Sequence, residues 1–167
     1  VCSILKRKGI NTMSSILEFE CVGLTEGGKI PLQYTGRGED KSPEFIFHNL
    51  SPDAKTIAII MDDVKHHLFG VFNHWVIWNI PAQSKIPGGL PAGKVLPNLG
   101  NAVQGIGYGR HKYAGPNPPR GKQHAYKFTI YALDSDITLK DNAKKNHLLK
   151  AIMPHILQQG EITGVFE

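Results

Sequence analysis

Two short apolar runs, TIAIIM at 56–61 and HWVIWNI at 74–80, place the strongest limit on the folds open to this chain. Both are rich in residues that favour strands, and turn-forming residues bound them. Neither alternates apolar with polar residues, as expected for strands buried on both faces in the middle of a layered structure. Both are far shorter than the ~20 apolar residues that a membrane-spanning helix needs, so no transmembrane segment is predicted.

Other segments of the chain share this strand-like composition. They are SILEFECVGL at 15–24, EFIFHNL at 44–50, YKFTIYAL at 126–133 and EITGVFE at 161–167. With 167 residues, of which 41% are hydrophobic and 20% charged, the chain has the size and composition of one globular domain. We therefore predict a single, mainly β domain over 1–167, in which 1–15 is a poorly ordered N-terminal extension.

One segment near the C-terminal end has the periodicity of a helix. Its apolar residues at the i, i+3, i+4, i+7 spacing are Leu149, Ile152, Met153 and Ile156. Pro154 interrupts the pattern, because proline lacks a backbone N–H and clashes with the preceding turn. We predict that helix is confined mainly to 138–159, with either a kink or two short helices that meet near 153–154.

The net charge of +5 is modest, but it is unevenly distributed. From 64 to 133 there is no Asp or Glu. The same span contains Lys65, Lys85, Lys94, Arg110, Lys112, Arg120, Lys122, Lys127, His66, His67, His74, His111 and His124. Such a span creates a positive potential where it folds together and favours an anionic partner, with a solvated basic surface as the alternative.

A long segment rich in Gly and Pro covers 81–121 and overlaps the stretch AGPNPPRGKQHAY at 114–126. We call residues 114–123 the proline loop. Long irregular segments in compact domains are usually functional or disordered. Here Tyr108, Tyr113 and the strand that follows favour an ordered loop.

Polar side chains gather at the ends of three predicted strands. Asp62 and Asp63 end the first apolar run, His74 begins the second, and His124 and Tyr126 begin the strand after the proline loop. His124 and Tyr126 share a face, because strand side chains alternate. A few polar groups at the edges of apolar strands are the composition of a small pocket. Each residue also has a structural interpretation, as a core histidine, a packed aromatic or a turn aspartate, and only the combination favours a site.

Most familiar enzyme motifs are missing from the sequence. There is no G-x-S-x-G, H-E-x-x-H or Walker lysine motif, and no familiar nucleic-acid signature, so we predict no nucleic-acid partner. No cofactor or metal is predicted, although Asp62, His74 and His124 could form a metal site. No catalytic residue is predicted, because no activated nucleophile stands beside a base. The alternative is a hydrolase acting on a small ester or phosphate compound, with Asp62 and His74 or His124 as acid and base.

The two cysteines, Cys2 and Cys21, are too few for a disulfide framework. No secretion signal is predicted, because polar residues follow the basic residues at 6–8. We therefore expect a cytoplasmic protein.

Five stretches together carry a resemblance to a known family. They are GGKIPLQYT at 27–35, SPEFIFHNL at 42–50, IAIIMDDVKH at 57–66, NHWVIWNIP at 73–81 and YAGPNPPRGKQHAYKFTIYALD at 113–134. In order and spacing they resemble the prokaryotic branch of the phosphatidylethanolamine-binding protein family, also called the Raf kinase inhibitor protein family. The likeness covers 18–167. Its most specific pieces are H-W-x-x-x-N-I-P and G-P-x-P-P-x-G followed by H-x-Y.

The resemblance implies a β-sandwich with short C-terminal helices and a pocket that binds phosphate, acetate or a phosphorylated head group. It also implies possible modulation of a partner protein, such as a kinase. The implied ligand-binding residues are Asp62, His74, Gly115, Asn117, Pro118, Pro119, His124 and Tyr126. Prokaryotic members tend to pair, so we expect a homodimer, with contacts from Leu90, Val95 and Leu96 unless these residues fold back on the core.

The chain also departs from the family pattern. Asp62 matches the first aspartate of D-P-D-x-P, but Asp63 replaces the next proline, Val64 replaces the second aspartate and His66 replaces the later proline. Ala125 stands where the family often has arginine. These changes alter the expected rim of the pocket.

Overall fold

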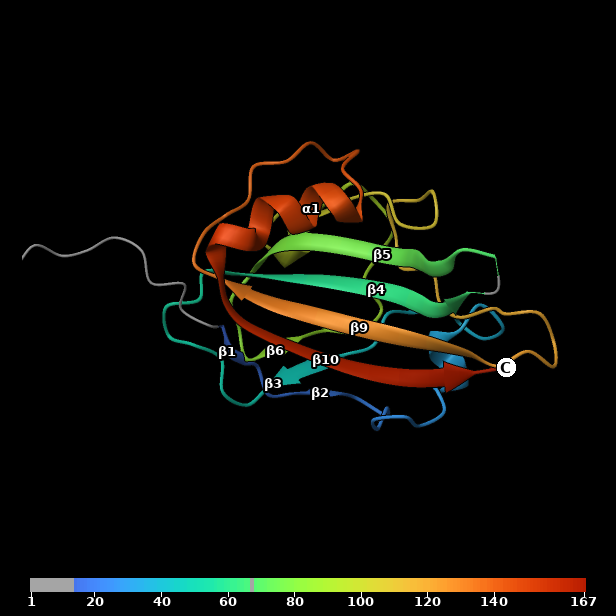
Figure 1. Ribbon diagram of the computed structural model, residues 1–167. Helices are drawn as coiled ribbons and strands as arrows, with labels where there is room; N and C mark the ends of the chain where they lie inside the picture. The colour runs from blue at the N-terminus through green and yellow to red at the C-terminus, as the bar shows by residue number, and fades with distance from the viewer. Residues whose placement is uncertain (1–13, 67) are drawn as a thin grey trace, which may run out of the picture.

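A computed structural model describes residues 14–66 and 68–167, which form two sheets with one α-helix beside them (Figure 1). The larger sheet contains, in spatial order, β1 (Ser15–Ile16), β10 (Ile156–Phe166), β9 (His124–Leu133), β4 (Thr56–His66), β5 (Gly70–Pro81), β8 (Ala102–Gln104) and β7 (Val95–Leu96). The smaller sheet contains β2 (Phe19–Cys21), β3 (Phe45–Phe47) and β6 (Lys85–Ile86). The helix is α1 (Lys145–Ile152), and three short 3₁₀ helices are η1 (Leu32–Tyr34), η2 (Pro97–Leu99) and η3 (Met153–His155).

With 42% strand and 11% helix, the chain is mainly β, as predicted. The two apolar runs form the central strands β4 and β5 of the larger sheet, and both of their faces are buried. On β4, Ile57 and Ile59 face the smaller sheet, while Ala58 and Ile60 pack with Leu148 of α1. Figure 1 shows α1 over β5, on the side of the larger sheet away from β2 and β3. The core therefore has two layers, one on each side of the larger sheet.

The predicted C-terminal helix is shorter than its pattern indicated. The break at the proline is confirmed, because α1 ends at Ile152 and Pro154 lies in η3. The extension to 159 is wrong, since β10 begins at Ile156 and pairs with β9 along its whole length. The buried face of α1 is Leu148 and Ile152, while Met153 is 72% exposed. Pairing with β9 has overridden the helical periodicity at this point.

Three further predictions concern the N-terminal extension, the two cysteines and membrane-spanning segments. The expected N-terminal extension lies almost entirely in residues 1–13, outside the described residues, as does Cys2, while Ser15 already pairs with Gln158. Cys21 is a buried residue of β2, and burial raises the pKa of its thiol to about 12. Among the described residues, no helix is long and apolar enough to cross a membrane.

The segment 81–121 is ordered into β6, β7, η2, β8 and connecting loops. Leu96 is buried in the core and Leu90 packs against it, so these two residues fold back on the core. Val95 is 46% exposed. The homodimer stays a prediction.

Candidate functional site

A small cavity lies at the end of the larger sheet where β4 ends and β9 begins. Figure 1 shows that the C-terminus lies at the same end of the sheet. The volume of the cavity is about 160 Å³. It is lined by Asp63, His66, His74, Tyr108, Asn117, Pro118, Pro119, His124 and Tyr126. We call it the inner cavity, because its strand residues face the space between the two sheets.

Regular strand geometry positions two of these side chains. His124 and Tyr126 alternate along β9 on the same face as Phe128, which belongs to the core between the sheets. Their rings lie 6.4 Å apart and nearly parallel. On β4, Asp63 is the direct neighbour of Tyr126 in the pairing register.

A β-bulge positions His74. Met61 pairs with Trp75 and Asp62 with Asn73, so His74 has no opposite residue in β4. A bulge can bring two consecutive side chains toward one face of the sheet. Trp75 belongs to the core between the sheets, and the ring of His74 lies 5.3 Å from that of Tyr126 on the same side. Simple alternation would have turned His74 to the other face.

The structure places the second aspartate of the pair, Asp63, in the inner cavity. The expected residue, Asp62, points to the opposite face of β4, because successive strand side chains alternate. There its Oδ2 lies 2.6 Å from Nζ of Lys145, and its Oδ1 accepts a hydrogen bond from the Asn73 side chain. The interpretation of Asp62 as the pocket-lining carboxylate is therefore corrected to Asp63.

His124 and Asp63 form a buried pair. Nδ1 of His124 lies 2.6 Å from Oδ2 of Asp63, and both side chains are 5% exposed or less. The other carboxylate oxygen, Oδ1, accepts a hydrogen bond from the backbone N–H of Lys65. A carboxylate that accepts from Nδ1 fixes the orientation of the imidazole ring.

His74 is held through the same ring atom by a different partner. Its Nδ1 lies 2.8 Å from the carbonyl oxygen of Ala114, and because a carbonyl only accepts, Nδ1 carries the proton. Burial lowers the pKa of His74, against smaller opposing contributions from the Ala114 hydrogen bond and the charge of Asp63. In the neutral ring Nε2 is an acceptor, and protonation turns Nε2 into a donor.

Tyr126 contributes a neutral hydroxyl. Burial, together with the nearby charge of Asp63, raises the pKa of Tyr126 well above its ordinary value. The hydroxyl therefore keeps its proton at any physiological pH and can donate it to a ligand.

Hydrogen bonds to the segment 34–40 hold the proline loop in place. The backbone N–H of Gly115 donates to Oδ1 of Asp40 at 2.7 Å, and the hydroxyl of Tyr113 donates to the carbonyl of Tyr34 at 2.7 Å. A Cβ on Gly115 would lie 2.2 Å from the Tyr34 carbonyl oxygen, so only glycine allows this approach.

Arg37 ties the rim of the inner cavity to the C-terminal strand. Its guanidinium donates to the carbonyl of Pro118 at 2.6 Å and to the carbonyl of Glu167 at 2.5 Å. It also lies over the ring of Phe166. Because prolines have no N–H, Pro118 and Pro119 give the rim shape and rigidity rather than donors.

Comparison with known proteins shows the family of the chain. Residues 23–167 match the phosphatidylethanolamine-binding protein family. The chain belongs to this family. A UPF0098 protein of Pyrococcus horikoshii is 40% identical over 140 residues, which cover 83% of this chain and 70% of that protein.

Two solved structures share the fold. A phosphatidylethanolamine-binding protein homologue of Chlamydia trachomatis has a TM-score of 0.79 and 28% identity, over 92% of this chain and 99% of that chain. The Escherichia coli protein YbcL has a TM-score of 0.76 and 23% identity, over the same shares of the two chains. The family and the fold predicted from the motifs are thus confirmed.

Within this family fold, the structure brings most of the predicted site residues together. The inner cavity is lined by the predicted residues His74, Asn117, Pro118, Pro119, His124 and Tyr126. Gly115 does not line the inner cavity; its backbone N–H instead donates to Asp40 and holds the proline loop. Sequence reasoning included Asp63 in the polar group but assigned the pocket role to Asp62. It missed two other lining residues, His66 and Tyr108, and the support from Arg37. Within 14–66 and 68–167, no group of three or more His, Cys, Asp and Glu residues is arranged to hold a metal ion.

Proposed function

We propose that the inner cavity binds a small anion, such as phosphate, acetate or a phosphorylated head group. The observation that carries the proposal is the pairing of two buried histidines, His74 and His124, each anchored through Nδ1, around one small cavity. In this arrangement the hydroxyl of Tyr126 can donate to an anion, and Nε2 of His74 can donate once the ring is protonated. The volume of about 160 Å³ suits a small anion or head group and is below the roughly 300 Å³ at which drug-sized pockets begin.

The charge of the inner cavity makes this binding depend on pH. The charge of Asp63 alone would repel an anion, but protonation of His74 adds a positive charge to the lining of the inner cavity. Hydrogen bonds from a charged donor are roughly twice as strong as those from a neutral one. Binding should therefore strengthen as the pH falls below about 6.5, because burial lowers the pKa of His74 from that ordinary value.

The experiment is an NMR titration of the protein with inorganic phosphate at pH 6. Backbone and imidazole resonances of Asp63, His74 and His124 are expected to shift together and to give one dissociation constant. In the variant His124→Ala the affinity should fall by about 1.5–3 kcal/mol, the range for a hydrogen bond to a charged group. His48→Ala is the control, because His48 is exposed and does not line the inner cavity. Shifts confined to other parts of the chain would contradict the proposal.

A hydrolase is the second candidate, because the Asp63–His124 pair has the geometry of a base and the carboxylate that orients it. The lining contains no Ser, Cys, Thr or Lys to act as a nucleophile, so hydrolysis would use water activated by His124. Turnover of aryl phosphates and aryl esters that disappears in His124→Ala would favour the enzyme. Binding without turnover favours the binding protein.

A regulated partner protein is the last element of the proposal. Leu68 and Phe69 are 71% and 64% exposed at the tip of the β4–β5 hairpin, and Phe69 stacks on His66 of the inner cavity. The affinity of a partner such as a kinase that binds this hairpin tip would then depend on whether an anion occupies the inner cavity. The cytoplasmic setting and the homodimer are further parts of this proposal, and sedimentation equilibrium at tens of micromolar tests the dimer.

A further inference from the structure

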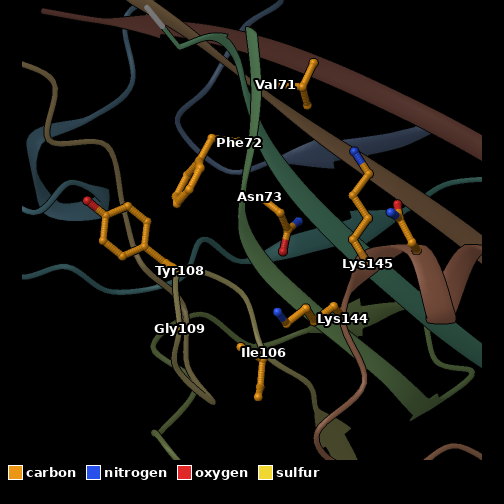
Figure 2. Close-up of a pocket in the computed structure, with 9 residues that line it drawn as sticks. Val71, Phe72, Asn73, Ile106, Tyr108, Gly109, Lys144 and Lys145 are labelled. Atoms are coloured by element: carbon orange, nitrogen blue, oxygen red, sulfur yellow. The ribbon is translucent and has the colours of Figure 1, made fainter. Parts of the chain in front are cut away.

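A second cavity, larger than the inner one, lies beside the same end of β5 and extends to the start of α1 (Figure 2). Its volume is about 470 Å³, and we call it the outer cavity. It is lined by Val71, Phe72, Asn73, Ile106, Tyr108, Gly109, Lys144, Lys145 and Asn146. Nothing in the proposed anion binding uses these residues except Tyr108, which lines both cavities.

The lining of the outer cavity has one uncompensated positive charge. Lys145 is paired with Asp62, whose Oδ2 lies 2.6 Å from its ammonium nitrogen. Lys144 makes no ion pair with any residue that the structure describes, and no acidic residue lines the cavity. Figure 2 shows its side chain reaching across the cavity between Asn73 and Ile106.

The remaining walls of the outer cavity combine apolar side chains with Asn73 and Asn146 and are partly open to solvent. Val71 is 52% exposed and Tyr108 is 46% exposed, although both are large apolar or aromatic side chains. The ring of Phe72 meets that of Tyr108 edge to face at 5.2 Å. Apolar surface that borders a single cation suits a ligand with an apolar body and an anionic end.

Backbone hydrogen bonds hold these walls in place. The N–H of Ile106 donates to the carbonyl of Ala143 at 2.9 Å, and the N–H of Tyr108 donates to the carbonyl of Asn73 at 3.0 Å. The first bond joins the loop to the segment that leads into α1, and the second joins it to β5. The outer cavity is therefore preformed, which lowers the entropy lost when a ligand binds.

We propose that the outer cavity is a second binding site, for a small organic anion with an aromatic or aliphatic body and a carboxylate or phosphate end. The anionic end pairs with the ammonium of Lys144, and the body covers Val71, Ile106 and the ring of Tyr108. The volume of about 470 Å³ lies within the roughly 300–1,000 Å³ of small-molecule sites. Inorganic phosphate alone gains little there, because only one unpaired cation and no cage of donors surrounds it.

The test is a ¹H–¹⁵N NMR titration with three probes of matched size: 3-phenylpropionate, benzyl phosphate and the neutral 3-phenylpropanol. Both anions are expected to shift the amide resonances of Ile106, Gly109 and Lys144 at lower concentration than the alcohol does. The amides of Asp63 and His124 report the inner cavity separately, so failure of one site is distinguishable from failure of the other. Shifts at the inner cavity alone, or equal affinity for the alcohol, would overturn the proposal.

Variants at the start of α1, within α1 and on β5 test the proposal further. Lys144→Gln is expected to weaken the binding of both anions about tenfold, the loss for roughly 1.4 kcal/mol, and to leave the alcohol unchanged. Lys150→Gln removes the same charge from an exposed position of α1 that does not line the outer cavity, and should change the binding of neither anions nor alcohol. Val71→Asp places a negative charge at an exposed position of the lining, and it should also weaken the binding of both anions by repulsion. If both Lys144→Gln and Val71→Asp bind the anions as the parent does, the proposal is wrong.

Discussion

Oδ2 of Asp63 and Nδ1 of His124 lie 2.6 Å apart in the core, although the two residues are 61 positions apart in the chain. Antiparallel pairing of β4 with β9 brings them to the same end of the sheet. On the opposite face of β4, the neighbouring carboxylate of Asp62 makes an equally short contact with Lys145. Two consecutive aspartates therefore serve two different faces of one strand.

This division predicts different results for the same substitution at the two positions. Asp63→Asn should flatten the pH dependence of anion binding, because the neutral amide no longer supplies the charge that favours protonation of His74. Asp62→Asn should leave binding within about twofold of the parent, and should lower the free energy of unfolding by about 1 kcal/mol, because its ion pair is partly exposed. Calorimetric titration and urea unfolding of both variants check this. Identical binding profiles for the two would contradict it.

The lowered pKa of His74 predicts a pH-dependent stability. The unfolded chain binds a proton at this histidine near pH 6.5, while burial lowers the pKa in the folded state. The unfolded state therefore holds more protons as the pH falls below about 6.5, and the free energy of unfolding decreases. Urea unfolding at pH 7.5 and 5.5, without phosphate, measures this decrease. In His74→Gln it should be smaller than in the parent, and an equal or larger decrease would show that His74 is not the cause.

The close approach at Gly115 predicts a local steric cost. Gly115→Ala would place a Cβ 2.2 Å from the carbonyl oxygen of Tyr34, so the proline loop must move. We expect a loss of about 2–3 kcal/mol in the free energy of unfolding, as for other overpacked sites. Gly121→Ala is the control, because a Cβ added there would meet no atom within 4 Å. The positive φ of 76° at Gly121 should lower the free energy of unfolding by only about 1 kcal/mol. Equal losses for the two variants would contradict the packing at Gly115.

The buried face of α1 predicts unequal effects along the helix. Leu148→Ala should lower the free energy of unfolding by about 2–4 kcal/mol, because Leu148 is fully buried against the outer face of the larger sheet. Met153→Ala should change it by less than about 0.5 kcal/mol, since Met153 is 72% exposed. Thermal unfolding of the two variants distinguishes this face from the one that the periodicity indicated.

Most of the fold could be predicted because its central strands carry a strong local signal. The runs at 56–61 and 74–80 are apolar on both faces, and the structure buries both faces. The end of α1 was also predictable, because Pro154 acts through its own covalent geometry. Strand β10 was predicted only from 161 onward, because its first residues continue an apolar helical period and only the pairing with β9 makes them a strand.

The residue types of the site could be predicted from the sequence better than the directions in which their side chains point. His124 and Tyr126 follow strict alternation, so their shared face could be read from the sequence. The choice between Asp62 and Asp63 depends on which face of β4 meets the smaller sheet, which is a tertiary property. The orientation of His74 depends on a bulge without any local sequence signal. Tyr108 and Arg37 reach the site from loops whose positions depend on distant hydrogen bonds.

Calorimetric titration with sulfate tests the central claim most directly, because sulfate keeps its charge between pH 5.5 and 8 and any change in affinity reports the protein. We expect the parent to bind sulfate about tenfold more tightly at pH 5.5 than at pH 8, equivalent to roughly 1.4 kcal/mol. In His124→Ala, sulfate binding at pH 5.5 should be weaker than in the parent by a similar factor. Equal affinity at the two pH values, with His124→Ala binding as well as the parent, would show that the two histidines do not form an anion site.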